Sequence, residues 1–263
     1  MFLSEKKIIK CKWCGAEAAI GNAPKRMPTW DRWLCKGCGS IGYCIDPSLD
    51  ELNHVYQTAW HDAVGSGQFA AGSTSERIAY SLISVLVGQS KLGSCLDYGG
   101  GKGVLAKTLV RLGSHDVSVF EPFGTDPKTP GVSWFSSWHD FPSDKKFDYI
   151  FMVEVIEHLL DPVEELRQIR ERLSSSGKLI ITTPNARGWH ARLDGTNWRE
   201  AQNPTHINLF SPLAIKACLK FAGFKQVKRV LKPVRYNANG LSALALALTQ
   251  IFGIDGGIRI IAS

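Results

Sequence analysis

The chain has 263 residues, of which 44% are hydrophobic, enough for one sizeable α/β domain and a small additional module. The N-terminus lacks the apolar core of a signal peptide, and the longest apolar stretch, Leu241–Ile254, is too short to cross a bilayer. We therefore expect a soluble, cytoplasmic protein without a membrane span. Leu241–Ile254 is predicted to be a buried helix, with a helix on a membrane surface as the alternative.

The formal net charge is +7, and much of the excess lies between Ser211 and Arg235, where Lys and Arg recur without Asp or Glu. One interpretation of this basic stretch is the solvated surface of a helix and a strand. The other is attraction of an acidic partner, such as a phosphorylated sugar, a nucleotide-linked group or RNA.

Two CxxC pairs stand near the N-terminus, Cys11 with Cys14 and Cys35 with Cys38. Their spacing is typical of a zinc ribbon, in which four thiolates close a structural Zn²⁺ site. Disulfides are the alternative, which the expected cytosolic location disfavours. We predict a zinc-ribbon-like module over 1–50. Its Trp, Lys and Arg residues are compatible with nucleic acid, but interleaved acidic residues make that partner the less favoured one.

The next segment, 51–75, is predicted to hold a short helix and a Gly/Ser-rich linker over 63–75. A helix capped by Thr74 or Ser75 should then run to Leu86. We assign 76–263 to a single larger domain.

A glycine turn follows the first strand of this domain, in the sequence Asp97-Tyr-Gly99-Gly-Gly101-Lys-Gly103. Glycine adopts a positive φ without strain and lets a ligand approach the backbone closely. The helix that begins at about residue 104 offers unpaired N–H groups to the same ligand. The spacing differs from the Gly-x-Gly-x-x-Gly of dinucleotide-binding turns.

The second strand, 116–120, ends at Glu121, whose carboxylate can accept both hydroxyls of a ribose. The next connection is too short for a full crossover helix, so this part of the fold should be abbreviated. Trp138, after a strand over 132–135, is interpreted either as a stacking partner for adenine or as a packing residue.

Strands are expected over 147–153, 178–185, 225–231 and 257–262, and helices over 162–173 and 212–222. Strands that alternate with helices predict a doubly wound α/β sheet. Val153, at the carboxyl end of the fourth strand, is a candidate cofactor contact.

Glu154, Glu157 and His158 come directly after the fourth strand, with the i, i+3, i+4 spacing of one helical face. His206 closes a long connection over 184–210 and can fold back over the same place. The group predicts a cluster that binds a divalent cation, Mg²⁺ or Mn²⁺, or removes a proton from a substrate. An exposed acidic turn is the alternative.

These motifs, in this order, resemble class I S-adenosylmethionine (SAM) methyltransferases related to the ubiquinone-pathway O-methyltransferases. The leading CxxC pairs resemble those of bacterial methyltransferases from sugar and polysaccharide clusters. Small-RNA 2′-O-methyltransferases have a similar Glu-x-x-Glu-His…His set, which holds a metal. The resemblance implies a Rossmann-like, seven-stranded sheet and SAM as cofactor.

We therefore expect methyl transfer from SAM to a hydroxyl of a small molecule or sugar. The alternatives are C-, N- or RNA 2′-O-methylation, and a non-catalytic scaffold that uses the ribbon for recognition. Predicted cofactor contacts are Asp97, Gly99, Gly101, Gly103, Glu121, Trp138 and Val153; predicted catalytic residues are Glu154, Glu157, His158 and His206.

Overall fold

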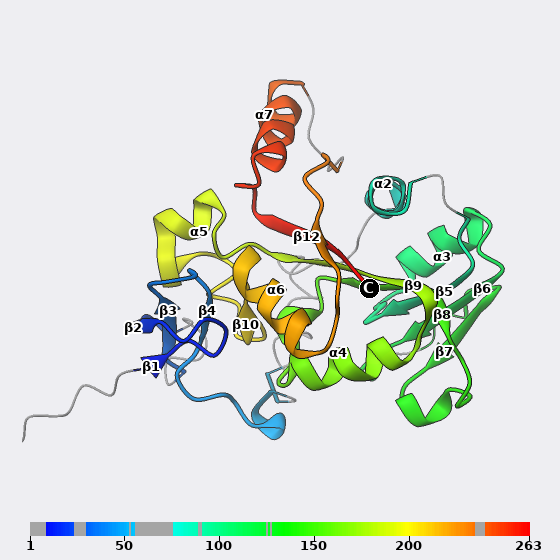
Figure 1. The fold of residues 1–263 in the computed structure, drawn as a ribbon, viewed down its shortest axis with the longest axis horizontal. Coiled ribbons are helices and arrows are strands. Elements are labelled where there is room, and N and C mark those ends of the chain that lie inside the picture. Colours follow the sequence, from blue (N-terminus) through cyan, green and yellow to red (C-terminus); the bar gives the residue numbers. More distant parts are fainter. Residues whose placement is uncertain are drawn as a thin grey trace, which may run out of the picture.

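A computed structural model describes residues 9–23, 30–52, 54–55, 76–88, 91–124, 126, 128–234 and 240–263. The predicted linker over 63–75 and the cap at Thr74 or Ser75 lie outside these ranges. The described residues form two sheets, a small one near the N-terminus and a larger one that carries most of the helices (Figure 1).

The larger sheet confirms the predicted doubly wound, seven-stranded arrangement. Its strand order is β11-β12-β9-β8-β5-β6-β7. Strand β12 is antiparallel to both its neighbours, β9 and β11, and the other strand pairs of this sheet are parallel. The bounds are β5 (Ser94–Tyr98), β6 (Asp116–Phe120), β7 (Val132–Phe135), β8 (Phe147–Val153), β9 (Leu173–Pro184), β11 (Val227–Arg229) and β12 (Gly257–Ala262).

Helices cover both faces of this sheet because each has one apolar side. On one face lie α2 (Glu76–Leu86) and α3 (Val104–Arg111), and on the other α4 (Pro162–Glu171) and α6 (Pro212–Phe221) (Figure 1). The side chains of Asp161 and Ser211 cap α4 and α6, as expected of acceptors that satisfy the first backbone N–H groups.

The connection between β6 and β7 has no helix among its described residues, as predicted, and the connection from β7 to β8 lacks an α-helix as well. A short 3₁₀ turn, η1 (Trp138–Asp140), follows β7 where a crossover helix would otherwise lie. Aromatic rings cover the sheet there instead, with Trp138 stacked on Phe120 at a centroid distance of 4.6 Å.

The connection after α4 differs from the prediction. The helix ends at Glu171, and residues 174–177, expected to be its terminal loop, belong to the long strand β9. Leu173 pairs with Phe147 before an irregularity in the β8–β9 register. Pairing with the neighbouring strand therefore overrides the turn tendency of Ser and Gly.

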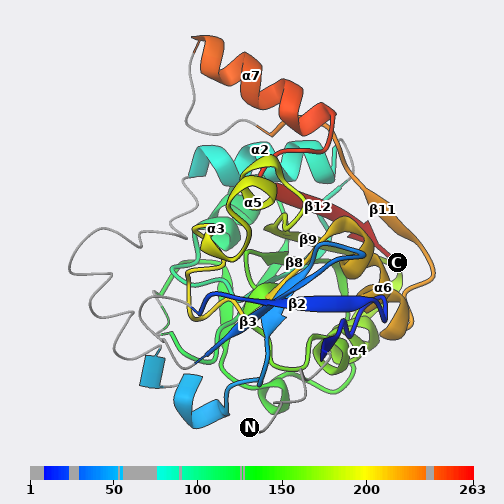
Figure 2. The same ribbon diagram turned by 90° about the vertical axis from the view of Figure 1, so that its left-hand side faces the viewer.

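The smaller sheet is built from β1 (Ile9–Lys10), β2 (Glu17–Gly21), β3 (Arg32–Cys35), β4 (Ile41–Tyr43) and β10 (Asn208–Leu209). We call residues 9–23 and 30–44 the cysteine module. Figure 2 shows β2 and β3 in front of the larger sheet. Because β10 comes from the long connection after β9, the module is joined to the larger part by a shared sheet. The boundaries 1–50, 51–75 and 76–263 stay a prediction.

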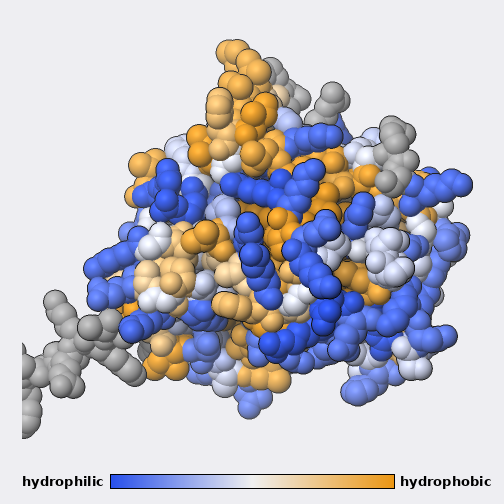
Figure 3. Space-filling model, viewed as in Figure 1, coloured by the Kyte–Doolittle hydropathy of each residue, from blue (hydrophilic) through white to orange (hydrophobic). Residues whose placement is uncertain are grey.

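Helix α7 (Gly240–Ile251) corrects the expectation of a buried helix over Leu241–Ile254. Leu241 and Phe252 are 86% and 72% exposed, and the helix stands out from the body as an apolar projection (Figure 3). Apolar composition predicted burial, but these described residues have too few neighbours to achieve it. No helix in the described ranges is long and apolar enough to cross a membrane.

Candidate functional site

The glycine turn lies between β5 and α3, at the carboxyl end of β5. Gly99, Gly101 and Gly103 all have positive φ, as predicted. A Cβ atom at Gly99 would approach Val155 Cγ2 to 2.6 Å, whereas one at Gly101 would meet no atom within 4 Å. Gly99 is therefore required by packing, while Gly101 faces open space beside the N-terminus of α3. That open space is where a ligand can meet the backbone.

Two acidic residues hold the glycine turn in shape. Glu121 Oε2 accepts a hydrogen bond from Gly101 N at 3.0 Å. Asp97 is buried, and its Oδ2 accepts from Ala106 N in α3 at 3.2 Å. Desolvation raises the pKa of the Asp97 carboxyl to about 7. Asp97 thus lies beneath the turn as its support, and direct cofactor contact by Asp97 stays a prediction.

Trp138 is half-buried in the aromatic cluster on the α4 face. Its Nε1 donates to Glu165 Oε1 at 2.6 Å, an oxygen that also accepts from Tyr98 Oη at 2.7 Å. These contacts favour the packing interpretation over adenine stacking. Val153 is the half-buried last residue of β8, and its predicted cofactor contact is likewise untested.

Glu154 departs from the predicted helical turn. It directly follows β8 and has φ 56°. Its N–H donates to Thr182 O at 2.9 Å, and its Oε1 accepts from Thr182 Oγ1 at 2.9 Å. Of the three predicted residues, Glu157 and His158 lie in the following 3₁₀ turn, η2 (Ile156–His158), and Glu154 does not. Pairing with β9 fixes Glu154 in the left-handed region, so the three residues do not share one helical face.

Glu154 is exposed to solvent, unlike its neighbour Glu157. Desolvation by surrounding protein and the nearby Glu200 raise the pKa of the Glu154 carboxyl, an effect that its solvent exposure limits. A non-glycine residue with positive φ costs about 1–3 kcal/mol, and such residues cluster at functional sites.

Glu157 is completely buried. Its Oε2 accepts from Thr183 Oγ1 at 2.8 Å, while Oε1 has no hydrogen-bond partner among the described residues. Desolvation and the nearby Glu154 hold the pKa of Glu157 well above its ordinary value, which favours the protonated form of this carboxyl. An unpaired buried oxygen is costly and indicates that this cluster meets a further group.

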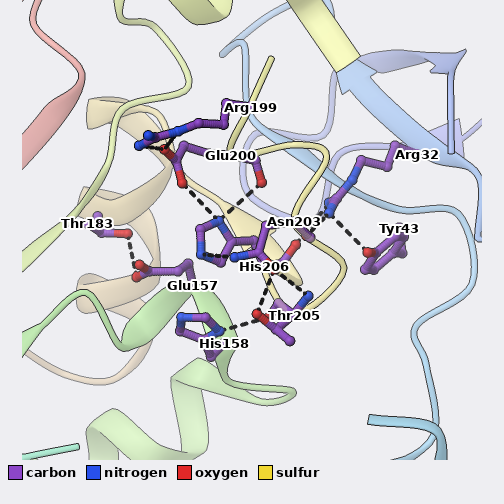
Figure 4. Close-up of polar contacts among 10 residues, drawn as sticks. All are labelled: Arg32, Tyr43, Glu157, His158, Thr183, Arg199, Glu200, Asn203, Thr205 and His206. Carbon is purple, nitrogen blue, oxygen red and sulfur yellow. Dashed lines mark hydrogen bonds and ion pairs between the residues drawn. The ribbon is translucent and has the colours of Figure 1, made fainter. Parts of the chain in front are cut away.

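His158 and His206 lie edge to face at the centre of the site, with ring centroids 4.7 Å apart (Figure 4). Ligand atoms of Glu157, His158 and His206 lie within 4.8 Å of one another, whereas Glu154 is outside this group. Burial lowers the pKa of His158 to about 4 and that of His206 well below its ordinary value. Both imidazoles are therefore neutral at pH 7.

The surroundings of these histidines include residues to which sequence analysis gave no role. His158 Nδ1 bonds to Thr205 O at 3.0 Å, and His206 contacts Asn203 and Glu200. Arg32, from β3, donates to the backbone of the same loop. Asn203 lies in the long connection over 184–210 that sequence analysis singled out, but no local pattern in β3 indicated that Arg32 would reach this site.

The four predicted zinc ligands converge. Cys11 Sγ lies 3.7 Å from Cys38 Sγ, and Cys14 Sγ lies 3.4 Å from Cys35 Sγ. The two pairs form matching turns, in which Gly15 N donates to Cys11 O and Gly39 N to Cys35 O. The cluster fits a zinc-ribbon-like module.

The same module does not present its aromatic residues to a nucleic acid. Trp13, Trp30 and Trp33 are 7%, 9% and 5% exposed, and Arg32 is fully buried. Trp13 packs on Phe210 of the larger part, with ring centroids 5.2 Å apart. These side chains serve the interface between the two sheets.

The fold and the glycine turn define a Rossmann-like methyltransferase of the SAM-dependent class. The chain belongs to the methyltransferase domain family, whose model matches residues 71–229. A curated relative, the tRNA U34 carboxymethyltransferase of Idiomarina loihiensis, is 27% identical over 149 residues, which cover 51% of this chain and 46% of the relative. The chain therefore spans about half the length of that relative.

Solved methyltransferase structures share the fold. A SAM-dependent methyltransferase from Thermotoga maritima, a possible histamine N-methyltransferase, has a TM-score of 0.51 at 17% identity, covering 81% of this chain and 98% of that one. The 1,6-didemethyltoxoflavin-N1-methyltransferase of Burkholderia thailandensis, solved with S-adenosylhomocysteine, has a TM-score of 0.54 at 14% identity, covering 85% and 94%. At such identities the likeness concerns the fold alone.

Proposed function

We propose that the protein transfers the methyl group of SAM to a hydroxyl of a small molecule or sugar. The observation that carries this proposal is the exposed carboxyl of Glu154, held by a left-handed backbone at the end of β8 and near enough to Glu157 to raise the pKa of that buried carboxyl. When bound, SAM supplies a methyl group activated by its sulfonium.

The residues of the glycine turn fit such a cofactor. Gly101 leaves open space at the N-terminus of α3, where a carboxylate is favoured by the backbone N–H groups. Glu121 is engaged with Gly101 N and Phe123 N, at 3.0 and 3.1 Å. Each carboxylate oxygen has a second lone pair, so Glu121 can also accept from ribose hydroxyls. Methyl transfer depends mainly on alignment, which this rigid turn provides.

Glu154 is the residue best suited to accept the hydroxyl proton. A general base works best when its pKa lies near the working pH, and the raised pKa of this carboxyl moves it in that direction. The lowered pKa of His158 makes its imidazole a weaker base. His206 already uses both ring nitrogens, one toward Asn203 and one toward Glu200.

Mg²⁺ does not fit Glu157, His158 and His206 as they stand. Mg²⁺ prefers oxygen ligands, and this group offers two imidazoles with one carboxyl. Mn²⁺ accepts nitrogen more readily, but it would have to break the bond between His206 and Asn203. We therefore derive no step through a divalent cation.

A Zn²⁺ ion in the cysteine cluster is a separate part of the proposal. Four sulfur atoms within 4.8 Å of one another suit the tetrahedral, thiolate-rich coordination of structural zinc. The ion would stabilise a module whose own apolar core is small.

The acceptor is proposed to be a small molecule or sugar, with an acidic group favoured by the exposed lysines of α6 and β11. An RNA acceptor is less favoured because the aromatic residues of the cysteine module are buried. The alternative to an enzyme is a non-catalytic scaffold that binds SAM and uses the cysteine module for recognition.

The test is calorimetric titration with SAM and S-adenosylhomocysteine, each with EDTA or with Mn²⁺, followed by a methyl-transfer screen of sugars, phenols and RNA. We expect micromolar binding of both compounds without added cation, and product only with hydroxyl acceptors. Binding without turnover on any acceptor would favour the scaffold. Absence of binding in every condition would contradict the assignment of the glycine turn.

A further inference from the structure

The cysteine module places a buried cation against the loop that carries His206. We call residues 203–206 the histidine loop. Arg32 is 0% exposed, and its Nη1 donates to His206 O at 2.9 Å while Nη2 donates to Asn203 O at 2.9 Å. In the described part of the chain no carboxylate forms an ion pair with Arg32. Its charge is therefore directed at backbone carbonyls of this loop.

Tyr43, on the adjacent strand β4, contacts both Arg32 and the histidine loop. The guanidinium of Arg32 lies 4.1 Å from the centre of the Tyr43 ring, and Nη2 donates to Tyr43 Oη at 3.0 Å. Tyr43 Oη in turn donates to Pro204 O at 2.9 Å. Two side chains of one module thus hold three carbonyls of the histidine loop.

The remaining carbonyl of the loop faces the other way. Thr205 O bonds to His158 Nδ1 at 3.0 Å, so each of the four carbonyls between 203 and 206 has a side-chain partner. Figure 4 shows the loop between Arg32 and Tyr43 on one side and Glu157 and His158 on the other. Because Arg32 and His158 bond to the same short backbone segment, which also carries His206, a displacement of Arg32 should move both imidazoles.

Strand β10 also connects the histidine loop to the cysteine module. Asn208 pairs with Gly42 and Leu209 with Ile41, so the chain that leaves the histidine loop becomes an edge strand of the module. Arg32 shares β3 with Cys35, one of the clustered cysteines. The geometry of the cysteine cluster and that of the histidine pair are thus joined through one sheet.

We propose that Arg32, supported by Tyr43, is a positioning residue that sets the orientation of His158 and His206, so that the cysteine module is part of the active site. The effect on methyl transfer rests on the proposed function, but the effect on the histidines does not. A recognition module on a separate surface would have no need of a fully buried arginine donating to this loop.

The test compares Arg32→Met, Tyr43→Phe and Trp33→Leu in the full-length, metal-loaded protein. Trp33 neighbours Arg32 on β3 and is 5% exposed, so its replacement disturbs the packing of the module without removing a donor to the loop. The readouts are the ¹⁵N signals of the two imidazoles, amide hydrogen exchange of residues 205–207, and SAM affinity.

In Arg32→Met we expect amide exchange of 205–207 to rise at least about tenfold, because hydrogen bonds to a charged group are lost. Both imidazole signals should shift, while SAM affinity changes less than about threefold. Where an acceptor is known, kcat should also fall, because the histidine pair lies within 4.8 Å of Glu157, whose neighbour Glu154 is the proposed base. Trp33→Leu should lower stability but leave the imidazole signals unchanged.

Unchanged imidazole signals in Arg32→Met would overturn the proposal, as would equal changes in Trp33→Leu. If Arg32→Met does not fold, Tyr43→Phe decides in the same way, because it removes only the hydroxyl between Arg32 and Pro204. Failure of the proposed function, with no acceptor methylated by the wild-type protein, leaves the imidazole and exchange readouts intact. The two failures are therefore distinguishable.

Discussion

Asn203 fixes the proton on His206. Its Nδ2 lies 3.0 Å from His206 Nε2, and its Oδ1 accepts from both the N–H and the hydroxyl of Thr205, at 3.1 and 2.8 Å. Because Oδ1 is committed to these donors, Nδ2 must donate to the ring. His206 Nε2 is then the acceptor, and the proton stays on Nδ1, which faces Glu200 O at 3.1 Å.

Asn203→Asp should reverse this assignment. The new carboxylate can still accept from Thr205, but it cannot donate to His206 Nε2. We expect the His206 pKa to rise from its lowered position and the ring to become protonated on both nitrogens near neutral pH, paired with the carboxylate and with Glu200. Imidazole ¹⁵N shifts measured against pH check this. Asn197→Asp, on an exposed residue, controls for the added charge and should leave His206 neutral.

Glu154→Gln and Glu157→Gln should have different effects. Glutamine resembles a protonated carboxyl, so Glu157→Gln should keep the fold and SAM affinity and lose less than about tenfold in turnover. Glu154→Gln removes the proposed base and should cost about 10²–10⁴-fold in kcat with SAM binding retained. Glu164→Gln, an exposed carboxyl on α4, is the control. If Glu157→Gln instead lost more kcat than Glu154→Gln, the main catalytic role would belong to Glu157 with a bound cation.

Gly99→Ala and Gly101→Ala separate packing from ligand access. Both positions have positive φ, so each alanine costs about 1–2 kcal/mol in backbone strain. Gly99→Ala should destabilise further because of its contact with Val155. Gly101→Ala should fold more stably than Gly99→Ala but bind SAM at least about tenfold more weakly. Thermal unfolding and calorimetry test the pair, and wild-type SAM affinity in Gly101→Ala would remove that residue from the site.

Local signals in the sequence were sufficient for much of the fold. The glycine turn, the starts of the helices at Pro162 and Pro212, and the apolar run of β8 each depend on nearby residues, and all were placed correctly. The burial of α7 was predicted wrongly because composition gives the tendency of a helix to be covered, but not the presence of a covering element.

The candidate site depended on contacts that are distant in sequence. Glu154 leaves the helical turn because Thr182 on β9 bonds both its backbone and its side chain. Arg32 contacts His206 across 174 positions of the chain, and no periodicity in β3 reveals that partner. Sequence analysis selected Glu154, Glu157, His158 and His206 as candidates, and tertiary contacts determine which of them face solvent and which are buried.

Asp97 makes stability depend on pH. Its folded pKa of about 7 lies above the ordinary value of 3.8, so between these values the native state holds a proton that the unfolded chain has released. Its stabilising contribution is present below about pH 4 and is lost as the pH rises through about 7. Urea unfolding should show that the wild-type protein loses stability relative to Asp97→Asn over this range, by at most about 4 kcal/mol. Asp144→Asn, at an exposed position, should follow the wild-type curve; a constant difference between the wild-type protein and Asp97→Asn would mean that Asp97 is ionised throughout.

Removing one predicted zinc ligand should affect both parts of the molecule. Cys35→Ser is expected to lose bound zinc and to lower the melting temperature by roughly 10 °C, as a loss of a few kcal/mol does in a protein of this size. Because Cys35 ends the strand that carries Arg32, amide exchange in residues 205–207 should also increase. Cys44→Ser, half-buried and outside the cluster, should retain the metal and the exchange pattern. Zinc content measured by mass spectrometry, together with exchange, checks both expectations. Loss of zinc without any change in the histidine loop would show that the metal stabilises only the module and that the arginine contact is maintained by packing alone.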